Sequence, residues 1–268
     1  MTDLSPVVLI TGASSGIGRA CARHLHGRGY RVFGASRRPQ PDEVFIPVEM
    51  DVDDDASVQR GVERVLAEAG RIDVVVNNAG YALAGAVEDT SIEEAQAQFE
   101  TNFFGVLRVT RAVLPAMRQQ RSGLIVNISS IGGVIGLPFQ GVYSASKHAV
   151  EGLTEALRHE VRPFGVRVAL ICPGDYRTNT TANRRRPARD QSVYAAQFER
   201  TLQVIEHDEQ SASTPEPVAR LLEQIIRSAK PRPRYLIGPL VEQAAVRVRP
   251  FVPGRVFEFF VRKFYRLD

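Results

Sequence analysis

Short runs of apolar residues alternate along the chain with segments in which apolar residues recur every three or four positions. Such runs are typical of fully buried strands, and the longer spacing is typical of helices with one buried face. The pattern predicts strands at residues 7–11, 31–36, 44–52, 72–77, 124–129, 167–172 and 234–237. It predicts helices at residues 16–29, 56–69, 91–119 and 142–162, the third of which begins with a capping box at Ser91 and Glu94.

The order of these elements predicts the fold class. Buried strands that alternate with amphipathic helices indicate a doubly wound α/β fold with a mostly parallel, seven-stranded sheet of Rossmann type. No repeat or composition break divides the chain, so we expect a single domain over residues 1–268. Within it we expect a mobile, polar substrate loop at residues 176–212, and a basic, aromatic C-terminal extension at residues 239–268.

Composition narrows the function classes. Hydrophobic residues make up 44% of the 268 positions, which suits a globular protein with a large core. Only two cysteines occur, and nothing before the first strand resembles a secretion signal, so we expect a cytoplasmic protein. Residues 227–268 hold ten Lys or Arg against three Asp or Glu, whereas the preceding residues hold 24 against 27. This uneven charge indicates a local basic feature and argues against nucleic-acid binding.

The turn after the first predicted strand is rich in glycine. It reads TGASSGIG, with Gly12, Gly16 and Gly18 separated by Ser14, Ser15 and Ile17. Glycines allow a tight turn and a close approach of the backbone to a pyrophosphate, and the following helix directs its free N–H groups at the phosphates. Such a turn alone is weak evidence, but its place between a strand and a helix favours a dinucleotide site.

Three further strand ends carry candidate cofactor contacts. Arg37 and Arg38 stand where an enzyme that prefers NAD has an acidic residue, so they favour the 2′-phosphate of NADP(H), unless they are ordinary solvated arginines. Asp51 and Val52 end the third strand and are candidates for adenine contacts. The sequence NNAG places Asn78, Ala79 and Gly80 after the fourth strand, as a ligand-binding edge or an ordinary turn.

A tyrosine and a lysine lie one helical turn apart in an otherwise apolar helix. Lys147 follows Tyr143 by four residues, and a positive charge there is expected to lower the pKa of the phenol. Ser130 ends the fifth strand and is placed to polarise a carbonyl oxygen. On its own, this tyrosine–lysine spacing is also common on solvated helix surfaces.

Taken together, these motifs resemble the short-chain dehydrogenase/reductase family. The resemblance rests on TGASSGIG, NNAG, YSASK with Ser130 thirteen residues before Tyr143, and PGDYRT at residues 173–178. It implies that Tyr143 is the general acid and base, Ser130 orients the substrate oxygen, and Lys147 holds the nicotinamide ribose. It also implies that Asn102 supports a proton relay, and that the nicotinamide is covered by Pro173, Gly174 and Thr178. Ser15 stands where some NADP-preferring members have a basic residue, so the cofactor preference depends on Arg37 and Arg38.

The expected function is an NADP(H)-dependent oxidoreductase that interconverts a ketone and a secondary alcohol. A largely apolar pocket is expected around Ile131, Leu137, Gln140 and Tyr176, which favours a lipophilic steroid-, retinoid- or ketoacyl-like substrate. Residues 184–186 are arginines that are either solvated or attract an anionic substrate group, together with Arg189. The alternative is a cofactor-binding regulator or scaffold without catalysis, which would not need Ser130, Tyr143, Lys147 and Asn102 together.

The C-terminal segment GRVFEFFVRKFYRLD predicts a basic helix with many aromatic residues. So much aromatic surface needs a partner. Packing on the protein's own domain or on a second subunit is the leading interpretation, as a homodimer or homotetramer. Contact with a membrane surface is the alternative.

Overall fold

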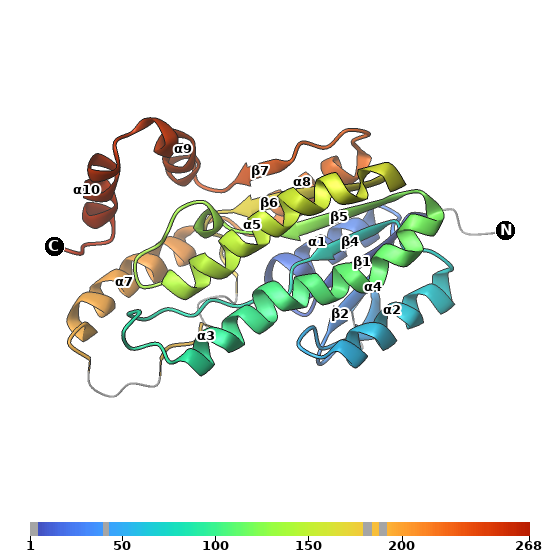
Figure 1. Ribbon diagram of the computed structural model, residues 1–268, viewed down its shortest axis with the longest axis horizontal. Coiled ribbons are helices and arrows are strands. Elements are labelled where there is room, and N and C mark those ends of the chain that lie inside the picture. Colours follow the sequence, from blue (N-terminus) through green and yellow to red (C-terminus); the bar gives the residue numbers. More distant parts are fainter. Residues whose placement is uncertain (1–4, 40–42, 179–183, 188–191) are drawn as a thin grey trace.

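A parallel sheet forms the centre of the molecule. The computed structural model describes residues 5–39, 43–178, 184–187 and 192–268 (Figure 1). Its sheet has the order β3-β2-β1-β4-β5-β6-β7, and every neighbouring pair of strands is parallel. The strands are β1 (Val7–Thr11), β2 (Arg31–Ser36), β3 (Ile46–Glu49), β4 (Val74–Asn77), β5 (Gly123–Ile128), β6 (Val166–Pro173) and β7 (Arg234–Ile237). The predicted doubly wound α/β fold with seven strands is therefore confirmed, and the sheet is wholly parallel.

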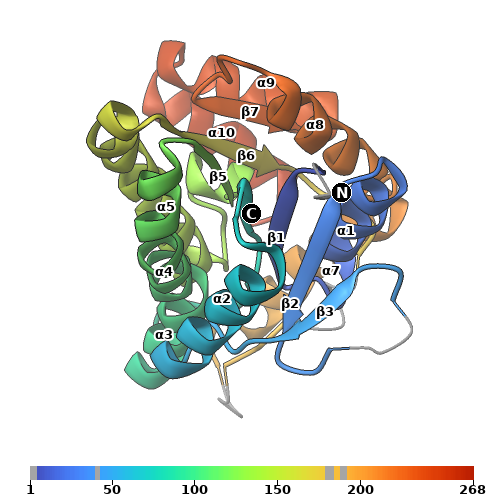
Figure 2. The same ribbon diagram turned by 90° about the vertical axis from the view of Figure 1, so that its right-hand side faces the viewer.

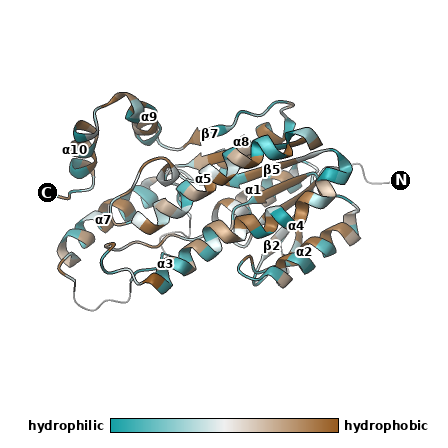
Figure 3. Cartoon of the chain, viewed as in Figure 1, coloured by the Kyte–Doolittle hydropathy of each residue, from teal (hydrophilic) through white to brown (hydrophobic). Residues whose placement is uncertain are grey.

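Helices cover both faces of this sheet (Figure 2). One face packs against α1 (Gly16–Gly27) and α8 (Glu216–Arg227), and the other against α2 (Asp55–Ala69), α4 (Gly105–Gln120) and α5 (Gly141–Val161). Successive side chains of a strand point to opposite faces, so Leu9 joins the second cluster and Ile10 the first. Both are fully buried, which is why the strands are apolar throughout (Figure 3).

Capping residues set the ends of the helices. The carboxylate of Asp54 accepts a hydrogen bond from the backbone N–H of Ser57 and starts α2, which ends at Gly70 in a left-handed conformation (φ 72°). The predicted capping box is present, because Ser91 and Glu94 bond each other's backbone N–H groups at the start of α3 (Ile92–Phe99). Local sequence therefore determines these boundaries.

The long helix predicted at residues 91–119 is present and contains one π-helical turn. A π-helical turn, η1 (Glu100–Phe104), separates α3 from α4. A π turn inserts one extra residue into a helix, and this one places Asn102 in the protein interior. The periodicity of apolar residues continues through the insertion, so it predicts the long helix correctly but does not reveal the π turn.

The segment expected as a polar loop contains a helix. α7 (Ala195–Ser211) occupies the second half of residues 176–212, and residues 179–183 and 188–191 lie outside the described residues. The loop prediction was wrong over α7, because Leu202 and Ile205 form a buried helical face between charged neighbours. Residues 184–187 lie against residues 82–84, where Leu83 and Arg185 form a parallel bridge.

The chain ends in two helices beyond the edge strand β7. These are α9 (Leu240–Val248) and α10 (Gly254–Phe264), which lie at one end of the molecule (Figure 1). Phe257 packs with Leu137 and Val246 beside the turn after β5. The backbone oxygens of Tyr265 and Leu267 accept hydrogen bonds from side chains of α7. The C-terminal segment is thereby fixed next to α7.

Within the described part of the chain, no helix is both long and apolar enough to span a bilayer.

Candidate active site

A cavity of about 940 Å³ opens along the carboxyl ends of the strands. Ligands bind at this edge in open α/β sheets, because the strand order reverses there and the loops diverge. Every site residue predicted from the sequence lines the cavity except Gly18 and Asn102. The fold thus brings together segments that are far apart in the chain.

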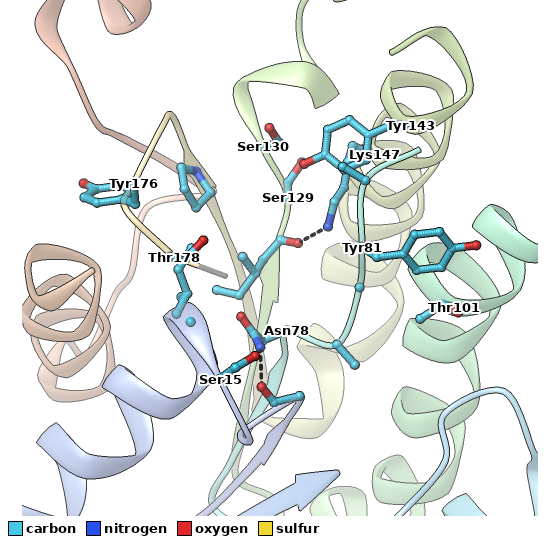
Figure 4. Close-up of a pocket in the computed structure, with 18 of the residues that line it drawn as sticks. Ser15, Asn78, Tyr81, Thr101, Ser129, Ser130, Tyr143, Lys147, Tyr176 and Thr178 are labelled. Carbon is cyan, nitrogen blue, oxygen red and sulfur yellow. Dashed lines mark hydrogen bonds between the residues drawn. The ribbon is translucent and has the colours of Figure 1, made fainter. Parts of the chain in front are cut away.

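Two glycines allow the first turn to touch the turn after β4. A Cβ atom on Gly12 (φ 66°) would lie 2.8 Å from the Cα of Ala79, and one on Gly18 would overlap the side-chain amide of Asn78. Asn78 also donates hydrogen bonds from its amide to the backbone oxygens of Thr11 (2.9 Å) and Gly12 (3.3 Å), the second of which is drawn in Figure 4. Gly18 therefore acts from outside the cavity, through packing.

The start of α1 faces the cavity with its positive dipole end. Ser15 is the N-cap residue, but among the described residues no side chain caps this helix. Backbone N–H groups of the first turn are therefore available to a ligand, and Ser14, Gly16 and Ile17 line the cavity beside them. This geometry suits a bound phosphate.

Charged groups surround the cavity beyond the end of β2. Arg37 and Arg38 are exposed and line it, as do Asp51 and Val52. Sequence reasoning missed Asp53, which accepts a 2.9 Å hydrogen bond from the hydroxyl of Thr101. Burial raises the pKa of Asp53, and the positive charge of Arg37 lowers it again. Arg37 is therefore close enough to act on groups inside the cavity.

The Ser130 and Tyr143 side chains meet at the cavity wall. Ser130 precedes a short 3-10 turn, and its hydroxyl accepts a 3.0 Å hydrogen bond from the backbone N–H of Gly132. Tyr143 lies in the first turn of α5, and its phenol lies next to the Ser130 side chain (Figure 4): a Cβ atom on Gly132 would be 3.2 Å from Tyr143 Cε1 and 3.5 Å from Ser130 Oγ. Burial raises the pKa of Tyr143 to about 12, although the neighbouring Ser130 hydroxyl lowers it.

The expected lowering of the Tyr143 pKa was wrong for this structure. The reason is the direction of Lys147, whose Nζ atom lies 6.0 Å from the centre of the Tyr143 ring and donates a 2.9 Å hydrogen bond to the backbone oxygen of Ile128. Burial of the phenol therefore outweighs the effect of the ammonium. Tyr143 is a protonated phenol at neutral pH, ready to donate a proton.

Lys147 itself is an ammonium taken out of water. Its side chain belongs to the buried face of α5, and burial lowers its pKa to about 8. Burying an ammonium group costs folding free energy. Lys147 lines the cavity, so a role in binding or chemistry there explains why a lysine is kept at this position. Groups with pKa values perturbed by burial cluster at functional sites.

Asn102 supports the site from behind. Its amide donates to the backbone oxygen of Tyr81 (3.0 Å) and to the hydroxyl of Ser146 (3.2 Å), and its side-chain oxygen accepts from the N–H of Tyr81. A Cβ atom on Gly80 would lie 2.9 Å from that oxygen and 3.8 Å from Nζ of Lys147. Asn102 thus fixes the turn after β4 beside the lysine.

The far end of the cavity is only partly apolar. Ile131, Leu137 and Gln140 line it as expected, and Ile205 and Tyr265 add apolar surface from α7 and the C-terminus. The ring of Tyr176 packs largely in the core beside α1 and α8. Sequence reasoning missed three acidic residues that share this wall, Asp175, Asp208 and Glu209. The expectation of a largely apolar pocket was therefore incomplete.

The arginines of the loop bind other protein groups. Arg184 is buried and forms ion pairs with Glu209 and Glu206, and Arg186 pairs with Glu206 at 3.3 Å. The guanidinium of Arg185 lies 4.2 Å from the centre of the Tyr81 ring. Arg184 is therefore neither a solvated arginine nor free to bind a substrate anion, because its side chain is paired inside the protein. Arg189 lies outside the described residues.

Comparison with known proteins identifies the family. The family model described as short chain dehydrogenase matches residues 6–189. The chain belongs to the short-chain dehydrogenase/reductase family. Within this family, it is 42% identical over 265 residues to the 3-ketodihydrosphingosine reductase of Bacteroides thetaiotaomicron, and the match covers 97% of this chain and 98% of that protein.

Solved structures of the family have the same architecture. A short-chain dehydrogenase from Streptomyces avermitilis superposes with a TM-score of 0.83 at 34% identity, covering 92% of this chain and 93% of that one. A short-chain dehydrogenase/reductase from Burkholderia phymatum, solved in complex with NAD, gives a TM-score of 0.81 at 29% identity, covering 94% and 95%. The similarity thus extends beyond residue 189 into the C-terminal quarter of the chain.

Proposed function

We propose that this protein is an NADPH-dependent reductase that converts a lipophilic ketone to a secondary alcohol. The observation that carries the proposal is the close pair of Ser130 and Tyr143 side chains at the cavity wall, next to the buried Lys147. The interconversion of ketones and alcohols is the chemistry of the related 3-ketodihydrosphingosine reductase, as its name states. The reverse oxidation uses the same groups.

The cavity fits a nicotinamide dinucleotide. Its phosphates would lie at the uncapped start of α1 and its nicotinamide between Lys147 and the Pro173–Gly174 turn, with Thr178 nearby, all of which line one continuous space. Asp51 and Val52 would contact the adenine, and Asn78 to Gly80 would line the middle. When bound, the reduced cofactor supplies a hydride to the carbonyl carbon.

The protein's own residues handle the carbonyl oxygen. The Ser130 hydroxyl donates a hydrogen bond to it, and the Tyr143 phenol transfers its proton to it as the negative charge develops. The ammonium of Lys147, one helical turn away, stabilises the resulting phenolate. Asn102 fixes the turn next to Lys147, and we propose that it also supports the proton relay that the family resemblance implies.

The preference for NADPH rests on Arg37 and Arg38. Both are exposed at the cavity edge, where a guanidinium can bind a 2′-phosphate through two oxygens. We expect Arg37→Leu and Arg38→Leu each to weaken NADPH binding at least about tenfold, with NADH binding unchanged. Equal affinity of the unaltered protein for the two cofactors would refute this preference.

The substrate class follows from the apolar lining and from the relative. Ile131, Leu137 and Ile205 offer apolar surface next to Tyr143. The relative is named for a ketone with a long alkyl chain, so we favour an alkyl ketone over a steroid or retinoid. NADPH oxidation with long-chain alkyl, steroid and retinoid ketones separates these classes.

The deciding experiment compares wild type with Tyr143→Phe on that panel. We expect a loss of about 10²–10⁴-fold in turnover with unchanged NADPH affinity, because only the proton donor is removed. Tyr194→Phe is the matched control, since its hydroxyl bonds Glu88 outside the cavity. Tight NADPH binding without turnover of any ketone, or of the alcohols with NADP⁺, would instead favour the regulator.

We also propose that the C-terminal extension contacts an anionic membrane surface. Phe251 and Phe260 are 87% and 63% exposed, and Arg255, Arg262 and Lys263 lie on the same short segment. A symmetric dimer through this face would bring like charges together, whereas anionic lipids complement them. If the wild type floats with anionic vesicles and Phe260→Glu does not, the membrane contact is supported. If the wild type does not bind vesicles but forms dimers that Phe260→Glu abolishes, the membrane contact is overturned.

A homodimer or homotetramer through another face stays a prediction, which sedimentation velocity checks. A cytoplasmic location also remains a proposal. It is supported by Cys21 and Cys172, both of which are buried and unpaired.

A further inference from the structure

Three acidic residues line the far end of the cavity, and an apolar ketone substrate would not explain why they are there. Asp175 follows strand β6, and Asp208 and Glu209 lie near the end of α7. Glu209 is paired with the buried Arg184. Of these three, the residues that form no ion pair within the described part of the chain are therefore Asp175 and Asp208. Among the described residues no three acidic, histidine or cysteine side chains are grouped to hold a metal ion.

Asp175 is held in a fixed position by a second carboxylate. The side chain of Glu242, from α9, accepts a 3.0 Å hydrogen bond from the backbone N–H of Asp175. The Glu242 carboxyl group therefore lies next to that of Asp175. Burial and the charge of Glu242 raise the pKa of Asp175 to about 8. Two carboxylates in contact cannot both ionise easily unless a cation joins them.

Asp208 lies on the same wall and forms no ion pair with any of the described residues. It is half-buried, and burial raises its pKa while His207 lowers it. Burial raises the pKa of Tyr265, whose side chain lines the cavity, and the negative charges of Asp175, Glu242 and Asp208 raise it further. The two aspartates therefore act on one region of the cavity, the part formed by α7 and the C-terminal turn.

This region is close to the expected position of the carbonyl oxygen. The charge of Asp175 raises the pKa of the Tyr143 phenol, so Asp175 interacts electrostatically with the proposed proton donor. Of the cations near this end, Arg184 pairs with Glu209, and Arg185 lies over Tyr81. A positive group carried by the substrate, close to its ketone, would complement the aspartates.

An independent observation points to the same ligand chemistry. The relative that is 42% identical over almost the whole chain is named for 3-ketodihydrosphingosine, an alkyl ketone with an amino group on the carbon next to the carbonyl. We propose that Asp175 and Asp208 bind the ammonium group of an amino ketone substrate and thereby select it over neutral ketones. This proposal rests on the proposed reductase function, because the position of the ammonium group is inferred from a ketone placed next to Tyr143. Ile131, Leu137 and Ile205 remain for the alkyl chain.

The test measures binding separately from turnover. The full chain is loaded with NADPH, and its fluorescence reports the binding of a short-chain dihydrosphingosine, kept below its micelle concentration, or of its neutral N-acetyl counterpart. We expect the amine to bind at least about tenfold more tightly than the amide. A tenfold difference in Kd corresponds to about 1.4 kcal/mol, which a single charge interaction can supply. The Asp208→Asn and Asp175→Asn variants should each bring this ratio close to one.

A matched variant controls for general effects of charge. Glu199→Gln removes an exposed carboxylate from the same helix, α7, outside the cavity, and should leave the ratio unchanged. Should Asp175→Asn fail to fold, Asp208→Asn alone decides, because Asp208 is half-buried on a helix and makes no contact with Glu242 in the hydrogen bonds described.

Each outcome separates the two proposals. Equal binding of amine and amide by the wild type, or a ratio unaffected in Asp208→Asn, would overturn the ammonium site. If a neutral alkyl ketone is reduced while the amine has no advantage, the reductase function stands and the ammonium site falls. If the amine binds selectively but the corresponding amino ketone is not reduced, the ammonium site stands and the reductase function falls.

Discussion

Replacing Lys147 with methionine should remove a large electrostatic penalty together with the activity. Burial lowers the pKa of Lys147 from 10.5 to about 8, and each pKa unit corresponds to about 1.4 kcal/mol. At pH 7 the ammonium therefore costs the folded state about 3 kcal/mol. Methionine has a similar volume and no charge, but it leaves the backbone oxygen of Ile128 without its hydrogen bond, which costs about 1–3 kcal/mol. The net change at pH 7 should be between neutral and about 2 kcal/mol of stabilisation.

The pH dependence of this difference is the sharper measurement. The folded-state pKa is depressed, so the penalty is complete below pH 8 and is relieved as the pH rises towards 10.5, where the unfolded chain still binds the proton. Wild type should gain about 2 kcal/mol relative to Lys147→Met between pH 7 and 9.5. Urea unfolding of both proteins across this range measures the difference, in which other titrating groups cancel. Parallel curves would show that the ammonium is not destabilised, and the burial argument would fail.

Three other substitutions test the support of the site and the fold. Gly18→Ala should cost about 1–3 kcal/mol in thermal unfolding and weaken NADPH binding, because its Cβ would overlap the backbone oxygen of Gly12. Asp54→Ala should cost about 1 kcal/mol through loss of the α2 cap, with unchanged activity. Arg184→Met should cost about 3–5 kcal/mol in urea unfolding, because it leaves Glu209 buried without its cation. A change below about 0.5 kcal/mol in any of them would contradict its stated contact.

The strands and most helices were predictable because their signals are local. Leu9 and Ile10 face opposite clusters, so the strand had to be apolar throughout, and this is visible in the sequence. The π turn around Asn102 was not predictable, since one inserted residue leaves the apolar spacing nearly intact. It is set by tertiary contacts of Asn102 with Tyr81 and Ser146. Helix formation by α7 was hidden by its many charged residues.

The cofactor half of the cavity was predictable for a similar reason. Its glycine turn and strand ends are contiguous motifs, and a parallel sheet brings its carboxyl ends to one edge. The other half was not, because Asp208 and Tyr265 reach the cavity from distant segments without any motif. The direction of the Tyr143 pKa was missed because burial depends on the whole fold.

The family model ends at residue 189, yet Asp208, Glu242 and Tyr265 come from beyond it. The cavity is thus built by two stretches of the chain, the second of which lies outside the part that the family model matches. Exchanging this C-terminal quarter between relatives would rebuild one wall of the cavity and leave the glycine turn, Ser130, Tyr143 and Lys147 in place. For the same reason, an affinity tag fused after Asp268 would sit beside the wall built by Tyr265.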